Sequence, residues 1–378
     1  MKELTNNKLR ISFLPWADLG KSIKLGPITF WPYFGEDNQN KIADPEIKAY
    51  LNKLLNLFVD FYKGKPVKTI TICSYNNKHL YKLTDSVYET LRFAVDILIF
   101  TSIAPARKTI VSNINHSGGW APPTADIFEL YSFPLPNSLK DDFVAFRAGN
   151  SINLFKIGDF NFHKPFATGG IFSGPDEELI AGFDRCFSDD FPENIRERIL
   201  RSLEWFRLAH VEGADVSALS KVVMMATAFE ILLKFPKNSS EKKNYFTNYI
   251  KEHIASENFI KENRKIYNKN YEKTLAEFWA WDFYNLRSSI VHGDNVSYKV
   301  LIYKNSLSHL IVADLVFLEC MMQVLLDHEC ISNNIRSLKE KCAELLLNNK
   351  PEDNIKKSLA AKWFWDADDV HKALGWIS

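Results

Sequence analysis

The sequence has few cysteines, and none of them are closely paired. Its 378 residues include five, which are Cys73, Cys186, Cys320, Cys330 and Cys342. No two form a CxxC pair, so neither a disulfide framework nor a zinc knuckle is expected, and a reducing compartment suits the chain. The sequence also lacks a Walker A motif, a G-x-G-x-x-G motif and a G-x-S-x-G elbow. The common nucleotide-binding and serine-hydrolase motifs are therefore absent.

An excess of charge and a long apolar run are missing too. Lys and Arg number 47 against 46 Asp and Glu, a formal charge of +1. This balance argues against a protein that coats DNA but permits a local basic face. The two most apolar stretches, 93–105 and 311–326, are broken by Asp96, and by Asp314 and Glu319. Neither reaches the ~20 apolar residues of a membrane span, and the first residues do not resemble a signal peptide. We expect a soluble, cytoplasmic protein with no membrane partner.

What the chain has in quantity is apolar and aromatic residues. Hydrophobic residues make up 46% of it, and 28 are Phe, so it can build large cores. The chain is longer than a single hydrophobic core usually supports, which favours two domains.

The first half of the sequence predicts an α+β domain over residues 1–187, with an unknown ligand and a sensing or regulatory role. Alternating apolar residues predict strands over 9–14, 28–31, 69–72, 126–133 and 143–156, with a turn at Gly149–Asn150. A first helix should begin at Asp44 and Pro45 and end near Gly64. A second should begin at a capping box of Ser86 and Glu89 and end at Pro105.

The second half predicts an all-α bundle over residues 188–330, followed by a helical extension over 331–378. Apolar residues at helical spacing predict four long helices, over 192–210, 216–235, 273–291 and 299–327. A polar insert over 236–272 separates the second helix from the third.

The sharpest local feature is the run Tyr284-Asn285-Leu286-Arg287-Ser288-Ser289-Ile290-Val291-His292-Gly293. A His can move a proton near neutral pH, and a guanidinium can hold phosphate oxygens, so this pair suits phosphodiester transfer to a neighbouring 2′-hydroxyl. On a regular helix the two side chains diverge by about 140°. A helix end or a second subunit is then needed to bring them together. The alternative is structural, with Arg287 in an ion pair and His292 favoured by the helix C-terminus.

Two phrases together resemble the HEPN family of all-α nucleases. The Arg287/His292 run resembles its Arg, four to six residues, His motif, and Ala226-Thr227-Ala228-Phe229-Glu230-Ile231-Leu232-Leu233 resembles the buried helix of its Apea-like branch. The order of helices over about residues 190–330 also matches. The resemblance implies metal-independent RNA cleavage in a cleft between two protomers, with no cofactor.

On this resemblance Arg287 and His292 occupy the catalytic positions, and Ser288 and Glu230 are supporting residues. Ser288 departs from the Asn, Asp or His common after the Arg, so its auxiliary role is open. Glu230 either holds Arg287 or serves stability alone, since a Glu in an apolar helix needs a partner. Asp294 stands where toxin members silenced by a nucleotidyltransferase carry a Tyr, so that mode of silencing is not supported.

The polar insert is the remaining candidate. Residues 234–273 hold ten Lys and Arg against five acids, with Tyr245, Tyr249, Tyr267 and Tyr271 among them. Cations and stacking rings are typical of single-stranded RNA binding, and a solvated polar excursion is the alternative.

The predicted function is therefore that of a homodimeric HEPN-type endoribonuclease, a hydrolase of bacterial antiviral defence, abortive infection or toxin type. A phage or cellular trigger would act through the first domain. Two alternatives stay open: a non-catalytic HEPN-like module that binds RNA or a nucleotide, and a bundle that only dimerises while the first domain binds a ligand.

Overall fold

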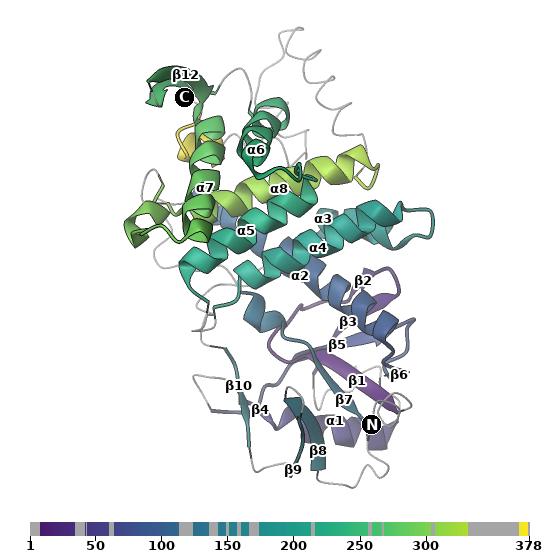
Figure 1. Cartoon of the computed structure of the whole chain (residues 1–378). Helices are drawn as coiled ribbons and strands as arrows, with labels where there is room; N and C mark the ends of the chain where they lie inside the picture. Colours follow the sequence, from purple (N-terminus) through teal and green to yellow (C-terminus); the bar gives the residue numbers. More distant parts are fainter. Residues whose placement is uncertain are drawn as a thin grey trace, which may run out of the picture. The chain divides into compact units, whose positions relative to one another are not determined.

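The computed structural model describes residues 8–34, 42, 44–59, 64–112, 124–135, 143–148, 151–156, 160–165, 174–212, 216–255, 259–266, 268–303, 307–331 and 370–376 (Figure 1). The chain divides into two compact units. The first comprises residues 1–103, 121–192 and 210–214, and the second comprises 104–120, 193–209 and 215–378. The first unit contains a sheet and the second is mainly helical, so the predicted mixture of α and β structure is confirmed.

The division into units differs from the predicted one in three respects, of which the first is that residues 210–214 belong to the first unit. The chain leaves the first unit between Pro192 and Glu193, five residues beyond the predicted boundary. Residues 104–120 also belong to the second unit. They include the end of a helix that begins in the first unit, so no loop or change of composition marks that crossing.

An antiparallel sheet forms the centre of the first unit. Its strands are β1 (Leu9–Leu14), β2 (Ile23–Leu25), β3 (Ile28–Tyr33), β5 (Ile70–Tyr75), β6 (Tyr81–Lys82) and β7 (Tyr131–Pro134). The order is β2-β3-β5-β1-β6, and β7 also pairs with β1. Ser12 in β1 faces Cys73 of β5 on one side and Ser132 of β7 on the other, so β1 is central. The predicted strands at 9–14, 28–31 and 69–72 are confirmed as β1, β3 and β5.

Two smaller pairings complete the β structure of this unit. The short strands β4 (Phe58–Val59) and β10 (Phe162–His163) pair in parallel, and β8 (Phe143–Ala148) pairs with β9 (Ser151–Lys156) in the predicted hairpin. Its turn residues, Gly149 and Asn150, lie outside the described residues. The predicted strand over 126–133 is wrong in its first half, where a 3-10 turn, η1 (Ala125–Phe128), precedes β7. Asp126 in that turn accepts a hydrogen bond from the Glu212 amide at 2.8 Å, a tertiary contact that alternation cannot reveal.

The first helix, α1 (Pro45–Leu55), begins as predicted and ends early. Asp44 accepts hydrogen bonds from the amides of Glu46 and Ile47 at 2.9 and 3.2 Å. The helix ends nine residues before Gly64, because the chain turns at Asn56 to enter β4.

The second helix, α2 (Asp85–Ser112), contradicts both predicted ends. Its first turn is capped by Thr84, whose hydroxyl accepts a hydrogen bond from the Val87 amide at 3.3 Å, instead of by a box of Ser86 and Glu89. Pro105 lies inside the helix. Proline cannot donate to the carbonyl four residues earlier, that of Thr101. The Asp176 amide donates to that oxygen at 2.9 Å instead, so the helix continues without an unpaired acceptor.

The rest of the first unit contains α3 (Glu177–Asp184), capped by Asp176, and a 3-10 turn, η2 (Arg185–Phe187). The helices of the second unit are α4 (Glu193–Ala209), α5 (Ala218–Leu232), α6 (Ser239–His253), α7 (Leu275–His292) and α8 (His309–Asp327). Four of them, α4, α5, α7 and α8, are the predicted long helices. The prediction placed the start of α8 ten residues too early. Residues 298–301 form a separate 3-10 turn, η3, and the Ser308 hydroxyl caps α8 by accepting from the Ile311 amide.

Contacts between phenylalanine rings, one pair stacked and two edge-to-face, link these four helices. Phe317 of α8 lies 5.3 Å from the ring of Phe206 in α4 and 5.3 Å from that of Phe229 in α5. Phe229 in turn contacts Phe283 of α7 at 6.1 Å. All four rings are buried. Aromatic pairs at such separations stabilise a core beyond the area that they bury.

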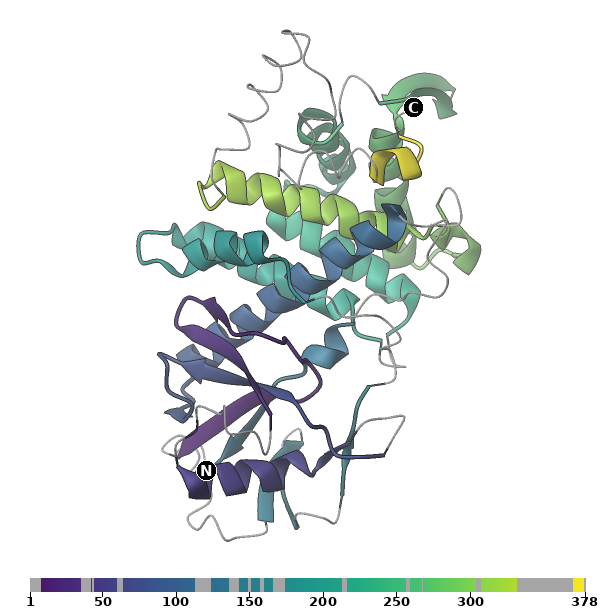
Figure 2. The same ribbon diagram turned by 180° about the vertical axis from the view of Figure 1, so that it is seen from behind.

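The polar insert is a folded part of this unit. It comprises α6 and a hairpin of β11 (Lys261–Ile266) and β12 (Lys269–Thr274). Phe246 anchors α6, since its ring lies 4.9 Å from Phe229 and 6.1 Å from Trp279. The described end of the chain, residues 370–376, packs nearby (Figure 2), where the carbonyl of Trp376 accepts a hydrogen bond from the Ile260 amide at 2.5 Å. The insert is therefore packed against the rest of the second unit.

Among the described residues, α8 is the single helix long and apolar enough to cross a membrane. In its most apolar window, 72% of the residues are buried inside the protein. Asp314, within that window, pairs with Arg107 of α2 at 2.9 Å and is itself buried. This burial marks α8 as a core helix of the second unit.

Candidate functional site

Local signals at both ends of α7 fix the helix that carries the Arg287/His292 run. The Thr274 hydroxyl accepts from the Glu277 amide at 3.2 Å, and the Glu277 carboxylate accepts from the Thr274 amide at 2.9 Å, which makes a capping box. Gly293 follows His292 with φ 77°, the left-handed conformation that ends helices. His292 is thus the last helical residue and lies exposed at the helix C-terminus.

Arg287 belongs to a polar cluster on the side of α7 that faces α5 and α6. Its guanidinium lies 3.1 Å from the Glu230 carboxylate of α5. The same carboxylate accepts a hydrogen bond from the Tyr284 hydroxyl at 2.8 Å and pairs with the ammonium of Lys242 in α6 at 2.5 Å. Glu230 therefore joins three helices, and its pairing with Arg287 fits both roles predicted for it, that of holding Arg287 and that of stability alone.

The side chains of this cluster are largely buried, which strengthens the interactions between their charges. The side chains of Glu230 and Arg287 are 13% and 20% exposed. The Nε of Arg287 is buried and has no hydrogen-bond partner among the described residues. Burial, the bond to Glu230 and the charge of that carboxylate all raise the pKa of Tyr284. A carboxylate with three donors around it fixes the orientation of Arg287.

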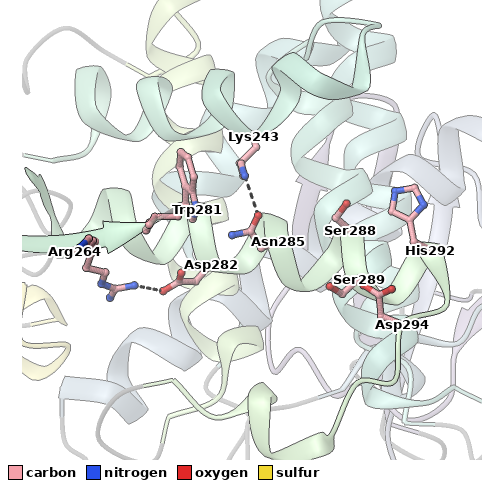
Figure 3. Close-up of a pocket in the computed structure, with 11 residues that line it drawn as sticks. Lys243, Arg264, Trp281, Asp282, Asn285, Ser288, Ser289, His292 and Asp294 are labelled. Carbon is pink, nitrogen blue, oxygen red and sulfur yellow. Dashed lines mark hydrogen bonds and ion pairs between the residues drawn. The ribbon is translucent and has the colours of Figure 1, made fainter. Parts of the chain in front are cut away.

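A groove of about 740 Å³ runs along a different side of α7 (Figure 3). It lies between α7, α6 and the β11–β12 hairpin, all within the second unit. Its lining consists of Lys243, Arg264, Lys265, Ile266, Trp281, Asp282, Asn285, Ser288, Ser289, His292 and Asp294. Arg287 is not among these residues.

One stripe of α7 forms the floor of the groove. Trp281, Asn285, Ser288 and His292 follow one another at steps of four, three and four residues. This spacing puts them on one face of an α-helix. Ser288 and His292 therefore share the groove.

Lys243 of α6 overhangs the other end of this stripe. Its ammonium donates to the side-chain oxygen of Asn285 at 3.0 Å and lies 4.0 Å from the centre of the Trp281 ring. A cation over an indole ring is attracted by the π-electrons. Partial burial lowers the pKa of Lys243.

The hairpin forms the opposite wall. Arg264 pairs with Asp282 of α7 at 2.7 Å, and its guanidinium lies 4.2 Å from the Phe278 ring. Lys265, the next residue, is exposed and lines the groove. The charges of Arg264 and Asp282 offset one another. The remaining charged groups of the lining are Lys243 and Lys265, and Asp294 close to His292, so the groove is more positive away from His292.

Arg287 and His292, the pair predicted to act together, thus lie apart within one protomer. Arg287 is brought together with Glu230, and His292 with Ser288. Sequence reasoning missed Lys243, Lys265, Trp281 and Asn285. The four-three-four spacing of α7 could have revealed Trp281 and Asn285, whereas the composition of the insert indicated its positive charge but not which of its lysines line the groove.

No metal centre is apparent in the described part of the chain. It contains no group of three or more His, Cys, Asp or Glu side chains placed to hold a metal ion. The arrangement provides instead a His for proton transfer, hydroxyl and amide donors, and ammonium groups for an anion.

Comparison of the chain with protein-family models, curated proteins and solved structures gives no match.

Proposed function

We propose that this protein is a metal-independent endoribonuclease of the HEPN type that cleaves RNA in the groove along α7. The observation that carries the proposal is the position of His292. This residue is the last of α7, the helix with the Arg287/His292 run that resembles the family motif, and it lines a groove that also contains Lys243 and Lys265. The order of elements also supports the proposal, because it is the order that the resemblance implies. The chain runs from α4 through α5, which carries Glu230, then the insert and α7, to α8.

In the proposed reaction, the 2′-oxygen of the RNA attacks the adjacent phosphorus, and the bond from phosphorus to the 5′-oxygen breaks. His292 accepts the 2′-hydroxyl proton or donates a proton to the leaving 5′-oxygen. The products are a 2′,3′-cyclic phosphate and a free 5′-hydroxyl. Nothing in this balance requires a metal ion or an external nucleophile.

Arg287 enters the proposal through a second protomer. Within one chain Glu230 holds Arg287 away from the groove that His292 lines. A two-fold dimer would bring two Arg/His pairs face to face, so that a guanidinium stabilises the pentacovalent phosphorus of the transition state. The resemblance would also give this reaction a role in antiviral defence, in which the first unit senses a phage or cellular trigger.

A non-catalytic RNA-binding module is the second candidate. The observation in its favour is the engagement of Arg287 by Glu230, which suits a structural role for this arginine. Such a protein would use the same groove and bind RNA without cutting it.

One experiment separates the two functions. The full-length protein is incubated with total RNA in EDTA, and fragment ends are mapped for the wild type, His292→Ala and His253→Ala. His253 is an exposed histidine of α6 outside the groove and serves as the matched control. Cleavage by the wild type and His253→Ala, with none by His292→Ala, supports the enzyme. RNA binding without cleavage by any of the three supports the binding module.

A further inference from the structure

The two ends of the groove have different chemistry. His292, Ser288 and Asp294 provide proton-transfer and polar groups at one end, whereas Lys243 and Lys265, which pair with no carboxylate among the described residues, provide positive charge at the other. Trp281 and His292 mark these ends and are eleven residues apart on α7. At about 1.5 Å per residue, the ends lie about 16 Å apart along the helix.

Lys243 is oriented before any ligand arrives. Its contacts with Asn285 and with the Trp281 ring hold the ammonium over the groove. No carboxylate pairs with it within the described residues. An ammonium has three donors, and Asn285 takes only one of them. The adjacent Lys242 differs, because its ammonium pairs with Glu230.

Lys265 is the second cation at this end. It is exposed and lines the groove from β11. Arg264 beside it contributes little free charge, since Asp282 and Glu262 lie 2.7 and 3.4 Å from its guanidinium. Because Arg264 pairs with Asp282, the residue after Trp281, its neighbour Lys265 lines the groove from β11 beside the Trp281 end, and Lys243 lines that end from α6.

We propose that Lys243 and Lys265 form a phosphate-binding subsite for single-stranded RNA, remote from the bond that is cut at His292, with Trp281 and Asn285 as its positioning residues. The inference rests on the proposed function and adds to it a second point of contact with the substrate. A separation of about 16 Å corresponds to about five stacked nucleotides at about 3.4 Å each. The subsite therefore binds a phosphate up to about five nucleotides from the cleaved bond and sets the strand's register.

The size and shape of the site favour a single strand over a duplex. Its cations converge on a groove of about 740 Å³ between α6, α7 and a hairpin. A groove of this size admits a strand, whereas a duplex is bound over the wide shallow minor groove and its flanking phosphates.

The test measures binding separately from cleavage. A 12-nucleotide 2′-O-methyl oligouridylate lacks the attacking hydroxyl, so its affinity is measured by fluorescence anisotropy over a range of salt concentrations. The proteins are the full-length wild type, Lys243→Gln, Lys265→Ala and Lys261→Ala. Lys261 is the matched control, because it is exposed and follows the same face of β11 but does not line the groove.

Lys243→Gln and Lys265→Ala should each weaken binding about 3- to 10-fold and reduce the salt slope by about 0.7, whereas Lys261→Ala should match the wild type. Equal affinity for all four proteins, an equal loss in Lys261→Ala, or tighter binding of a 12-base-pair RNA duplex with the same lysine dependence would overturn the subsite. Because Lys265 is exposed, its replacement leaves the fold intact even if Lys243→Gln is unstable.

The two proposals fail in different ways. His292-dependent cleavage with unchanged binding in both lysine variants rejects the subsite and leaves the ribonuclease in place. Lysine-dependent binding without cleavage by the wild type supports the subsite and rejects the ribonuclease. A wild type that does not bind RNA rejects both.

Discussion

Arg287 and His292 lie five residues apart on α7 and have different surroundings. The Arg287 guanidinium lies 3.1 Å from the Glu230 carboxylate at the junction of three helices. The His292 imidazole lines a groove that Arg287 does not reach. This separation agrees with the divergence of about 140° expected for five helical steps. An active site that uses both side chains on one phosphate therefore needs more than one protomer or a movement of Arg287.

Replacement of Arg287 distinguishes a catalytic role from a structural one. Arg287→Lys keeps a positive charge near Glu230 but loses the bidentate guanidinium, so RNA cleavage should fall about 100-fold or more. Arg196→Lys is the control, since Arg196 of α4 is also paired with a carboxylate, that of Glu193, and does not line the groove. Cleavage rate and thermal midpoint are measured together. A lower midpoint with an unchanged cleavage rate would assign Arg287 to stability alone.

Removal of the Glu230 carboxylate should destabilise the second unit. Glu230→Ala leaves the mostly buried Arg287 and Lys242 without their shared anion, which should cost about 2–4 kcal/mol in the free energy of unfolding. Glu262→Ala removes a carboxylate whose side chain is 40% exposed, and should cost less than about 1 kcal/mol. Urea denaturation measures both. Equal losses would show that the Glu230 cluster contributes no more than a surface pair.

The sequence predicted α7 well because its ends are encoded locally. Thr274 with Glu277 caps the start, and Gly293 supplies the left-handed residue at the end. The end of α2 was mispredicted for the opposite reason. Pro105 is a strong local stop signal, but the Asp176 amide, from a distant segment, satisfies the carbonyl that Pro105 leaves free. A tertiary hydrogen bond overrode the local rule.

The candidate site was predictable only in part, and the missing part is non-local. His292 and Ser288 were found because they share a phrase on one helix. Lys243 reaches Asn285 from 42 residues away in sequence. The charge of the insert was visible in its composition, but only the folded α6 and hairpin determine which of its lysines face the groove.

The buried His309 should make stability depend on pH. Burial lowers the pKa of His309 below its ordinary value of 6.5, while the charge of Asp282 partly opposes this shift. The folded protein thus binds a proton on this residue less readily than the unfolded chain does. The resulting stability is fully present above pH 6.5 and is lost as the pH falls from there through the folded-state pKa.

This dependence is measured by urea denaturation at pH 7.5 and at pH 5.5. His309→Gln cannot titrate, so the loss of unfolding free energy between the two values should be smaller than in the wild type. The difference between the two proteins isolates His309 from other titrating groups. An identical loss in both would mean that His309 carries no pH dependence.

The proposed chemistry also determines which chemical groups the ends of the RNA fragments carry. Because the 2′-oxygen of the substrate attacks, fragments should carry a 2′,3′-cyclic phosphate, and the rate in EDTA should match that in Mg²⁺. Ligation-based mapping of 3′ and 5′ ends distinguishes these products from 5′-phosphates. Strict dependence on Mg²⁺ with 5′-phosphate ends would indicate a two-metal nuclease instead.

The separation of Arg287 from the groove also predicts that the protein is a dimer. A single His292 would have to act as both base and acid, and its own Arg287 is held by Glu230 outside the groove. A two-fold interface supplies a second histidine and a second arginine, and uses one surface patch twice, as a closed dimer requires. Light scattering should therefore give twice the chain mass of 43.6 kDa. A mixed dimer with one His292→Ala subunit should lose most of its cleavage rate, because the two histidines serve one phosphate. A monomer that cuts RNA at every concentration would contradict the composite site and require Arg287 to leave Glu230 within one chain.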